Sequence, residues 1–556
     1  MTEVHNQKDA ARESENSDNN AVPDALHKTV YGTAPANFTE LVAAGKHVLT
    51  KIEPSGAPIS LAQLTKAMQD GSFTGQEAQA TAALYLAFPK LASSPKGLSA
   101  GDLDKLPQLA KKEDGEFAQA KELKQWADSR LSHFIKSTPG SDADVISQSQ
   151  ISKALNDTTV SQSDKKFLKE LEQLIPTIGV PSSDNPRGAK QGLRLSDIDK
   201  YANDDPSAID NFWYRSDRAQ MIKDIRYAVS HTGEAESLDL SHNLYATADP
   251  LKSIKSDAVR QGWLGDCIFE SALAAIADSN PQLIQDAIKD NHDGTYTVTF
   301  PGAKDFPITA KAPTYQEQGL FNHASKDGIW ASVMEKAYGQ LVEQAPQSII
   351  AIDQATSNPW ISTNELKSKG EAKKTIDGTL DGSQNGSEWT SSDIPLNRLD
   401  VPHVALAKAD GLLPANYKNL APQEYVGGPG AMDEALTLLS GKKTTLTDLS
   451  PAWNADPVSS PEAIAAKNER IARLLETAMS SSPKLAVITG SDSSSTVAGI
   501  IPNHAYTVTN FKSDGHGGGT VSLRNPHAND FAPSYPEFLT MSLSDFATNF
   551  STVAND

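Results

Sequence analysis

The sequence predicts an α+β fold that is preceded by an all-α region. Three observations support this prediction. A helical pattern occurs twice within residues 36–205, an apolar helical pattern begins at Cys267, and three runs after residue 484 alternate between apolar and polar side chains. Hydrophobic residues make up 38% of the chain, which is enough for real cores, and the length suits about two to four domains.

Charge and cysteine content narrow the class of protein. The net charge of −20 disfavours nucleic acid and anionic membranes as partners, because both would repel the chain. Cys267 is the only cysteine, so the chain can form neither an internal disulfide nor a cysteine-rich zinc site. The start lacks a secretory signal and no long apolar run predicts a membrane span, so we expect a cytoplasmic protein, with a leaderless secretion route as the alternative.

The first part of the chain is polar and then repetitive. Residues 1–35 show no periodicity, which predicts disorder. In the helical region, ISLAQLTKAMQDGSFT (59–74) aligns without a gap on ISQSQISKALNDTTVS (146–161). Each copy opens with a serine that is followed three residues later by glutamine, the spacing of a capping box, and each closes on a similar tail, GLSAGDLDKL or GLRLSDIDKY. We expect two copies of a helical unit of about 50 residues.

The helix–loop–helix form of these copies raises the question of calcium binding. A calcium hand needs oxygen ligands at alternate loop positions, a central glycine and a closing glutamate. The stretches QDGSFTGQEAQA and NDTTVSQSDKKF do not supply this pattern. The helical repeats are therefore expected to be structural or to bind a protein partner.

Strand-like runs follow a change of composition at about residue 206. GTYTVTF (294–300) predicts a strand, and FLTMSLSDFATNF (538–550) is expected to end in a short helix that Ser542 caps. Residues 367–391 are rich in Gly, Ser, Asp and Lys, which predicts a surface insertion. Three further strands are expected near the end of the chain: LAVITG (485–490), HAYTVTNF (504–511) and GTVSLRNP (519–526).

Cys267 lies where a Gly-Asp turn runs into an apolar helix. A thiolate is the working nucleophile of cysteine enzymes, and the N-terminus of a helix favours its negative charge. The apolar face of this helix must be buried, which would hold the thiol rigidly. The other interpretation of a single cysteine is a small buried hydrophobic residue.

A cysteine nucleophile needs a histidine as base and a third group that orients the histidine. His504 opens a predicted strand, and Asn525 ends the next one. If Asp514-Gly515 is the centre of the hairpin, paired residue numbers sum to 1029, and 1029 − 504 = 525 places Asn525 opposite His504. The glycine-rich loop leaves a register shift of one or two residues open. A lone histidine in a strand is otherwise a half-buried structural residue.

Six segments, in order, resemble the calpain family. QGWLGDC (261–267) resembles the calpain cysteine motif, HAYTV (504–508) the histidine motif and LRNP (523–526) the asparagine motif. The resemblance covers about 240–553, apart from roughly 345–424. Three more segments are similar to calpain segments: DGIWASVMEKAYGQL (327–341), YVGGPGAMDEALTLLSG (425–441) and FLTMSLSDFATNFSTV (538–553).

The resemblance implies a papain-like two-lobe cysteine protease, with a helical lobe that carries the cysteine and a β-sheet lobe that carries histidine and asparagine. It implies that Cys267 is the nucleophile, His504 the base and Asn525 the group that orients His504. Gln261 and the backbone N–H of Cys267 would stabilise the oxyanion. The substrates would be proteins or peptides.

Some positions differ from the family pattern. Ile268 and His527 stand where calpains have tryptophan, and Asn503 stands where they usually have glycine. Asp257 lies one residue out of step with a calcium-binding acidic position of the calpain core. We therefore expect that no cofactor is required. Calcium remains an open alternative, but no readable ligand positions support it.

The leading hypothesis is a calpain-like cysteine endopeptidase that acts through a Cys-His-Asn triad and a glutamine oxyanion donor. The alternatives are a catalytically silent calpain-like binding module and another thiol acyl-transfer enzyme on the same fold. The predicted domains are a disordered N-terminus (1–35), a helical region with two repeats (36–205), a connecting segment (206–239), a first calpain-like lobe (240–344), a divergent insertion (345–424) and a second calpain-like lobe (425–556).

Overall fold

A computed structural model describes residues 37–93, 97–135, 145–181, 190–195, 217–238, 243–323, 326–356, 432–449, 461–492, 499–528 and 535–556, with a few isolated positions between them. The chain divides into two compact units, one made of residues 1–100 and 225–556 and the other of residues 101–224. The predicted disorder of residues 1–35 and the predicted surface insertion at 367–391 lie outside the described residues. The predicted domain boundaries stay a prediction, although each repeat copy lies largely in a different unit.

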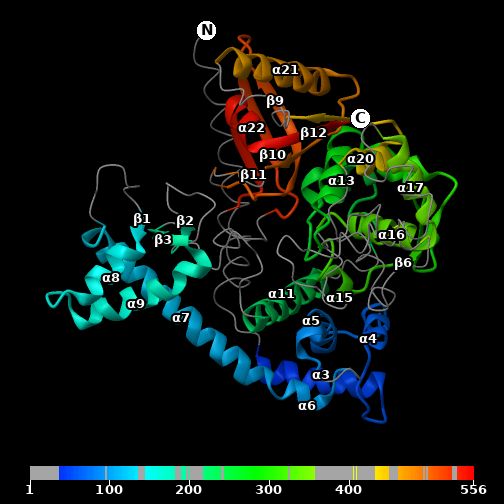
Figure 1. Ribbon diagram of the computed structural model, residues 1–556. Coiled ribbons are helices and arrows are strands. Elements are labelled where there is room, and N and C mark those ends of the chain that lie inside the picture. The colour runs from blue at the N-terminus through cyan, green and yellow to red at the C-terminus, as the bar shows by residue number, and fades with distance from the viewer. Residues whose placement is uncertain are drawn as a thin grey trace, which may run out of the picture. The chain divides into compact units, whose positions relative to one another are not determined.

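The first unit begins with a group of short helices (Figure 1). Their bounds are α3 (Phe38–Ile52), α4 (Leu61–Met68) and α5 (Gln76–Leu91), and α6 (Ala100–Leu103) follows at the boundary of the unit. The predicted capping box is present at α4. The Ser60 backbone N–H donates to Gln63 Oε1 over 2.9 Å, and the Gln63 N–H donates to Ser60 Oγ over 3.3 Å.

The second unit repeats this arrangement with different surroundings. It consists of α7 (Leu106–Arg130), η2 (Leu131–His133), β1 (Val145–Ser147), α8 (Gln148–Asn156), α9 (Gln162–Ile178), β2 (Val180–Pro181) and β3 (Lys190–Arg194), and its sheet has the order β1-β3-β2. The second capping box, between Ser147 and Gln150, is also present. Trp126 is buried and donates to Asp164 over 2.8 Å, which ties α7 to α9.

The tails of the two copies close in the same way. Ile59 pairs with Leu98 in an isolated antiparallel bridge, and Ile146 pairs with Leu193 in the ladder of β1 and β3. A glycine precedes each leucine. At Gly97, a Cβ atom would lie 2.0 Å from the carbonyl oxygen of Ile59, so no other residue fits without movement. The sequence repeat is therefore also a structural repeat.

The rest of the first unit begins with helices and one small sheet. Its elements are α11 (Asp217–Leu238, of which residues from 225 belong to this unit), α12 (Pro250–Ser253), η4 (Ser256–Ala258), α13 (Cys267–Ser279), α14 (Pro281–Ala287), β4 (Ile288–Asp290), β5 (Thr295–Val298), η5 (Pro301–Ala303), β6 (Ile308–Lys311), α15 (Tyr315–Gln318), α16 (Trp330–Gln344), α17 (Pro346–Ala355) and α20 (Met432–Ser440). The strands follow the order β4-β5-β6. The predicted strand at 294–300 is β5.

A six-stranded sheet forms most of the C-terminal part. Its elements are β7 (Thr445–Asp448), α21 (Pro461–Ser480), β8 (Val487–Ser491), β9 (Ala505–Ser513), β10 (Gly519–Arg524), β11 (Phe538–Ser542), α22 (Leu543–Asn549) and β12 (Phe550–Asn555). The strand order is β11-β10-β9-β8-β12-β7, and all pairs are antiparallel. The three strands expected from 485 onward are β8, β9 and β10, and Ser542 caps α22 as predicted.

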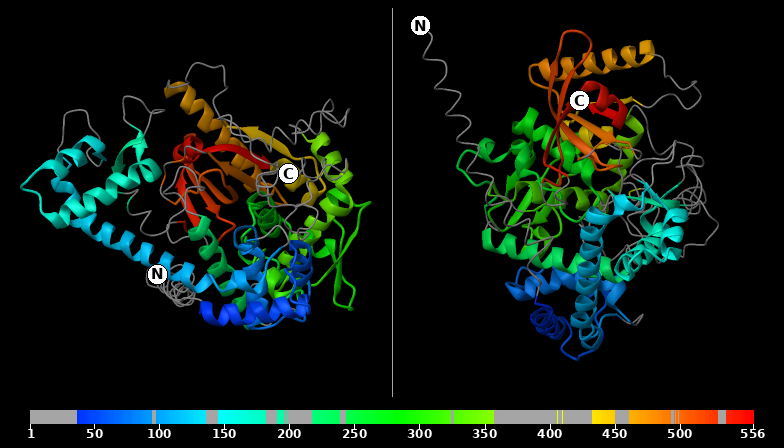
Figure 2. Two further views of the ribbon diagram at one scale, coloured as in Figure 1. Left: turned by 60° about the horizontal axis from the view of Figure 1, so that its bottom comes forward. Right: turned by 90° about the vertical axis from the view of Figure 1, so that its left-hand side faces the viewer.

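The two faces of this sheet pack against different helices (Figures 1 and 2). Val487 belongs to a hydrophobic cluster that contains residues of α21 and α22. Its neighbour Ile488 belongs to the cluster that contains α13, α16 and α20. Because successive side chains of a strand point to opposite faces, the alternating pattern of β8 joins both cores. The fold is thus a mixture of helices and sheets that follows a helical N-terminal part.

Helix α4 is fixed to α15 by side chains far away in the sequence. Gln316 Nε2 donates to the backbone oxygens of Ala67 (3.1 Å) and Asp70 (3.0 Å), and Thr314 Oγ1 donates to the oxygen of Met68 (2.7 Å). These bonds satisfy carbonyl groups at the end of α4 that have no partner within the helix. The first repeat copy is therefore attached to the part of the chain that carries Cys267.

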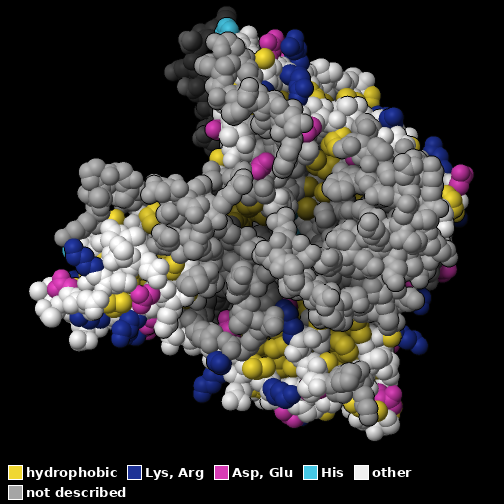
Figure 3. Space-filling view, viewed as in Figure 1, with side chains coloured by type: hydrophobic (Ala, Val, Ile, Leu, Met, Phe, Trp, Pro, Cys, Tyr) yellow, Lys and Arg dark blue, Asp and Glu magenta, His cyan; other side chains and the backbone are white. Residues whose placement is uncertain are grey.

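The surface of the described residues is mixed in charge. On the face in Figure 3, Lys and Arg side chains are interspersed with Asp and Glu side chains over the described residues. Among the described helices, none combines the length with the apolar character that crossing a membrane requires.

Candidate active site

Cys267 is the first residue of α13, as the sequence predicts. Asp266 precedes the helix, and Phe269, Leu273 and Ile276 form part of its buried face. Cys267 as a whole residue is half-buried. Packing of the helix therefore fixes the position of Cys267 at its first turn.

The environment of the thiol differs from the one expected at a helix N-terminus. Burial raises the pKa of the Cys267 thiol to about 11, although hydrogen bonds from the Ala505 and Ile268 backbone lower it. The nearby charge of Asp266 raises the pKa further. Desolvation by the surrounding protein therefore outweighs the favourable end of the helix dipole.

His504 lies directly before β9 and is held by its backbone. Its N–H donates to Ser491 Oγ over 2.9 Å, and its carbonyl oxygen accepts the N–H of Ser491 over 2.9 Å. The side chain is only 6% exposed. Burial lowers the pKa of His504 to about 4, against the effect of Asn525, which raises it. The imidazole is therefore neutral at pH 7.

Asn525 is adjacent to the imidazole of His504. The distance between His504 Nε2 and Asn525 Oδ1 is 2.9 Å. Because the amide oxygen can only accept, Nε2 carries the proton and Nδ1 has the lone pair that a base needs. The neighbouring residue Ala505 bonds to Cys267. The structure thus brings the predicted cysteine, histidine and asparagine into one region.

The predicted hairpin register was wrong even though His504 and Asn525 meet. The observed pairs are Val521 with Phe511 and Arg524 with Thr507, and a bulge lies between Ser522 and Leu523. Asp514 accepts the N–H groups of both His516 (2.8 Å) and Gly518 (3.0 Å), which moves the centre of the loop beyond Asp514-Gly515. The two side chains meet beyond the ends of the strands.

Gln261 is buried in front of the cysteine helix. Its backbone N–H donates to the oxygen of Pro526 over 2.8 Å, which joins the cysteine segment to the asparagine segment. Its side-chain Nε2 donates to the oxygen of Leu264 over 2.6 Å. The side chain also forms a hydrogen bond with Asp266, so both hydrogens of the amide nitrogen have partners and one must be released before Gln261 can bind an oxyanion.

Two residues that differ from the family pattern have a physical explanation here. His527 stacks on His504, with ring centroids 5.0 Å apart and ring planes 8° from parallel, and its N–H donates to Asn525 Oδ1 over 3.1 Å. Asn503 has a φ of 52°, a left-handed conformation that glycine adopts readily and asparagine tolerates. The imidazole of His527 covers the ring of His504, and Asn503 adopts the backbone conformation that the turn before His504 requires.

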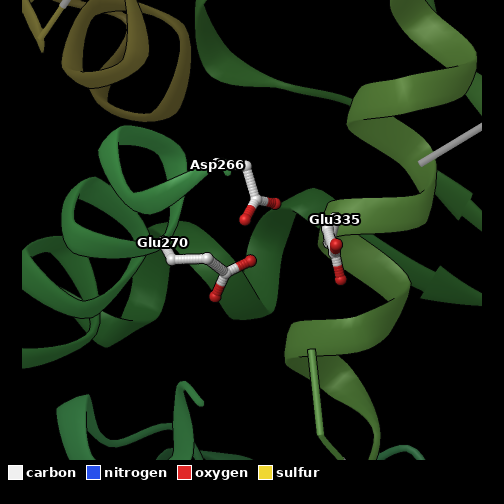
Figure 4. A group of neighbouring side chains, drawn as sticks. All are labelled: Asp266, Glu270 and Glu335. Atoms are coloured by element: carbon white, nitrogen blue, oxygen red, sulfur yellow. The ribbon is translucent and has the colours of Figure 1, made fainter. Parts of the chain in front are cut away.

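A group of three buried carboxyl groups was missed by the sequence analysis (Figure 4). Asp266, Glu270 and Glu335 point toward one another, and oxygen atoms of the three lie within 4.8 Å of one another. Burial raises the pKa of Asp266 to about 7 and raises the pKa values of Glu270 and Glu335 as well. The spacing of Asp266 and Glu270 places them one helical turn apart, but nothing in the sequence joins them to Glu335.

A cysteine at the start of a helix, in the same region as a histidine that an asparagine holds, is a combination found in cysteine proteases. Residues 242–349 match the family model of the calpain family cysteine protease. The chain therefore carries a calpain-type protease domain. The matched residues include Gln261 and Cys267 but not His504 or Asn525. None of the curated proteins compared with the chain matches it.

Proposed function

We propose that the protein is a papain-like, two-lobe cysteine endopeptidase that hydrolyses peptide bonds of protein substrates. Cys267 acts as nucleophile, His504 as base, Asn525 as the group that orients His504, and Gln261 as an oxyanion donor. The observation that supports this function best is the 2.9 Å contact between His504 Nε2 and Asn525 Oδ1. It leaves Nδ1 of a neutral imidazole as proton acceptor in the region of the only cysteine.

In the reaction, the sulfur of Cys267 attacks the carbonyl carbon of the substrate while its proton passes to Nδ1 of His504. The resulting oxyanion accepts hydrogen bonds from the Cys267 backbone N–H and from Gln261 Nε2. When the intermediate collapses, His504 gives the proton to the leaving amine and a thioester remains. Water, which His504 deprotonates, then hydrolyses the thioester and releases the thiol.

Contacts between the two parts of the site support an assembled arrangement. Arg524 is fully buried and donates from Nη2 to the oxygen of Val259 over 2.6 Å. Thr507 Oγ1 donates to the oxygen of Ser271 in α13 over 2.8 Å. These bonds hold β9 and β10 against the cysteine segment, which supports the proposal that cleavage does not require added calcium.

The runner-up function is a catalytically silent module that binds partners through the region around Cys267 or through the helical repeats. The inward hydrogen bond of Gln261 Nε2 to Leu264 favours it, because this bond competes with the oxyanion. In both cases the natural ligands would be proteins.

The decisive experiment uses an irreversible epoxide inhibitor of papain-like enzymes. The wild-type protein and Cys267→Ala are incubated with it, and the intact masses are measured. One adduct on the wild type and none on the variant, together with peptide hydrolysis by the wild type alone, is the expected result. A wild type that takes up no inhibitor and cleaves no peptide would favour the silent module.

A further inference from the structure

The three buried carboxyl groups beneath the cysteine present an unusual charge problem. Asp266, Glu270 and Glu335 are 2%, 0% and 1% exposed. An ionised carboxylate in the protein interior is costly unless a cation or hydrogen bonds compensate it. Figure 4 shows the three groups converging from the start of α13 and from α16.

The neighbouring basic residues are already engaged. The distance from Lys336 Nζ to Glu317 Oε2 is 2.6 Å, and the distance from Arg524 Nε to Glu537 Oε1 is 3.0 Å. Arg524 attracts Glu270 but directs its hydrogen bonds to Glu537 and to Val259. Among the described residues, no ion pair joins Lys or Arg to any of the three carboxyl groups.

Amide side chains complete the group. Asn322 is 1% exposed and touches two of the carboxyl groups: its backbone N–H donates to Glu335 over 2.6 Å, and its Nδ2 lies 2.5 Å from Glu270 Oε2. The side chain of Gln261 adjoins Asp266. In the described part of the chain, three buried oxygens here have no hydrogen-bond partner: Glu270 Oε1, Gln261 Oε1 and Asn322 Oδ1. Asp266 interacts with the side chains of Gln261 and Glu335.

The contact between Asn322 and Glu270 also fits a metal site. A separation of 2.5 Å is short for an N–H···O bond, and the two ends of an amide are interchangeable in position. Turning the amide by 180° would present Oδ1 to the interior of the group. All five candidate ligand groups then offer oxygen, the atom that hard divalent cations prefer.

We propose that Asp266, Glu270 and Glu335, with the amide oxygens of Asn322 and Gln261, form a binding site for a structural divalent cation. Calcium fits best, because it takes six to eight oxygens at about 2.3–2.6 Å, so opposite ligands lie about 4.6–5.2 Å apart. Magnesium holds its ligands at about 2.0–2.1 Å and keeps several waters, for which this buried group offers little room. The ion would join α13 to α16 next to the nucleophile, and it takes no part in the proposed reaction.

The test compares amide substitutions that keep the shape of the site but remove its charge. Wild type, Glu270→Gln, Glu335→Gln and the control Glu343→Gln are purified as full-length chains without chelators. Glu343 lies on α16 outside the group. The amount of bound metal per protein is measured by elemental mass spectrometry. The proteins are then unfolded in chelator, refolded, and titrated with calcium, magnesium or manganese while heat of binding and thermal midpoint are followed.

The expected result is one equivalent of divalent ion in the wild type and in Glu343→Gln, with calcium raising the midpoint of both refolded proteins. Glu270→Gln and Glu335→Gln should lose that ion or bind it at least about tenfold more weakly. Wild-type protein without metal, whose midpoint no ion changes, would overturn the proposal and mean that protons neutralise the group. Equal metal content in all four proteins would overturn it too, since the ion would then lie elsewhere.

Discussion

The surroundings of Cys267 and those of His504 bury polar groups by different means. On the histidine side, Asn525 Oδ1 accepts the imidazole N–H and the N–H of His527, and Ser491 bonds to the backbone of His504. On the cysteine side, the hydrogen-bonding neighbours of Asp266 include the side chains of Gln261 and of Glu335, another buried carboxyl group. Geometry on the histidine side thus depends on individual hydrogen bonds, whereas the cysteine side depends on how the charge of its interior is neutralised.

Removing one reactive group from each side gives the largest effect. Cys267→Ala and His504→Ala should each lower kcat for peptide hydrolysis by several orders of magnitude, because both act in the same proton transfer. Only His504→Ala should still be alkylated by iodoacetamide, more slowly than wild type. The thermal midpoint of Cys267→Ala should stay close to that of wild type. Equal hydrolysis by Cys267→Ala and wild type would refute the protease function.

Substitution of Gln261, the proposed oxyanion donor, tests whether the cysteine side contributes to catalysis through groups other than the thiol. Gln261→Ala should lower kcat by roughly 100- to 1000-fold, the usual effect of losing one such donor. Circular dichroism and the thermal midpoint show whether the variant remains folded, since Gln261 is buried. A folded variant that loses less than tenfold would mean that other groups bind the oxyanion.

The pH dependence of the histidine side follows from the low pKa of His504. An unfolded histidine binds a proton near pH 6.5 and His504 only near 4, so the free energy of unfolding should fall as the pH drops through this interval, by roughly 3 kcal/mol at most. Above pH 6.5 this contribution is fully present. Denaturant titrations between pH 4 and 7 measure it, and His504→Gln should lose most of the slope. The same slope in both proteins would assign it to another group.

Single hydrogen bonds and ring contacts on the histidine side should have moderate effects. Asn525→Ala removes the acceptor for Nε2 and should lower kcat by about tenfold, as expected for a hydrogen bond of about 1.5 kcal/mol. His527→Ala should cost less, and His527→Phe should restore most of that loss, because an aromatic ring keeps the stacking. If His527→Phe is as slow as His527→Ala, stacking is not what His527 contributes.

The smallest expected effect is on stability, and it comes from removing either of the two capping boxes. Ser60→Ala and Ser147→Ala should each cost about 1 kcal/mol, because the same side-chain bond is lost. Each loss should appear in the transition of its own compact unit, since Ser60 and Ser147 belong to different units. Kinetics with peptide substrate serve as control. A variant whose unfolding curve matches wild type would show that its cap contributes nothing.

Local signals predicted much of this architecture. Ser60, Ser147 and Ser542 cap helices as their spacing predicts, and Cys267 begins its helix, because each feature depends on a few adjacent residues. The hairpin register could not be predicted, since the side-chain bonds of Asp514 and the bulge after Ser522 set it. The carboxyl group of Glu335 reaches Asp266 only through tertiary packing.

The proposed catalytic roles of four residues rest on the sequence motifs and on the contact between His504 and Asn525: Cys267, His504, Asn525 and Gln261. The spacing in the sequence predicted that His504 and Asn525 face each other, but the strand register behind this prediction was incorrect. The contact forms because Asn525 lies just beyond the end of β10. The raised pKa of the Cys267 thiol could not be predicted from the sequence either, because it results from burial by residues that are distant in the chain.

The distance between the reactive residues along the chain has a consequence during protein synthesis. His504 is made 504 − 267 = 237 residues after Cys267. At about 5–20 residues per second, the ribosome needs roughly 12–47 seconds to add them. Gln316, which fixes the end of α4, is made within that interval. Throughout this interval the nascent chain holds the thiol of Cys267 without its proposed base, so under the proposed function the growing polypeptide and the translation machinery are not exposed to an activated nucleophile.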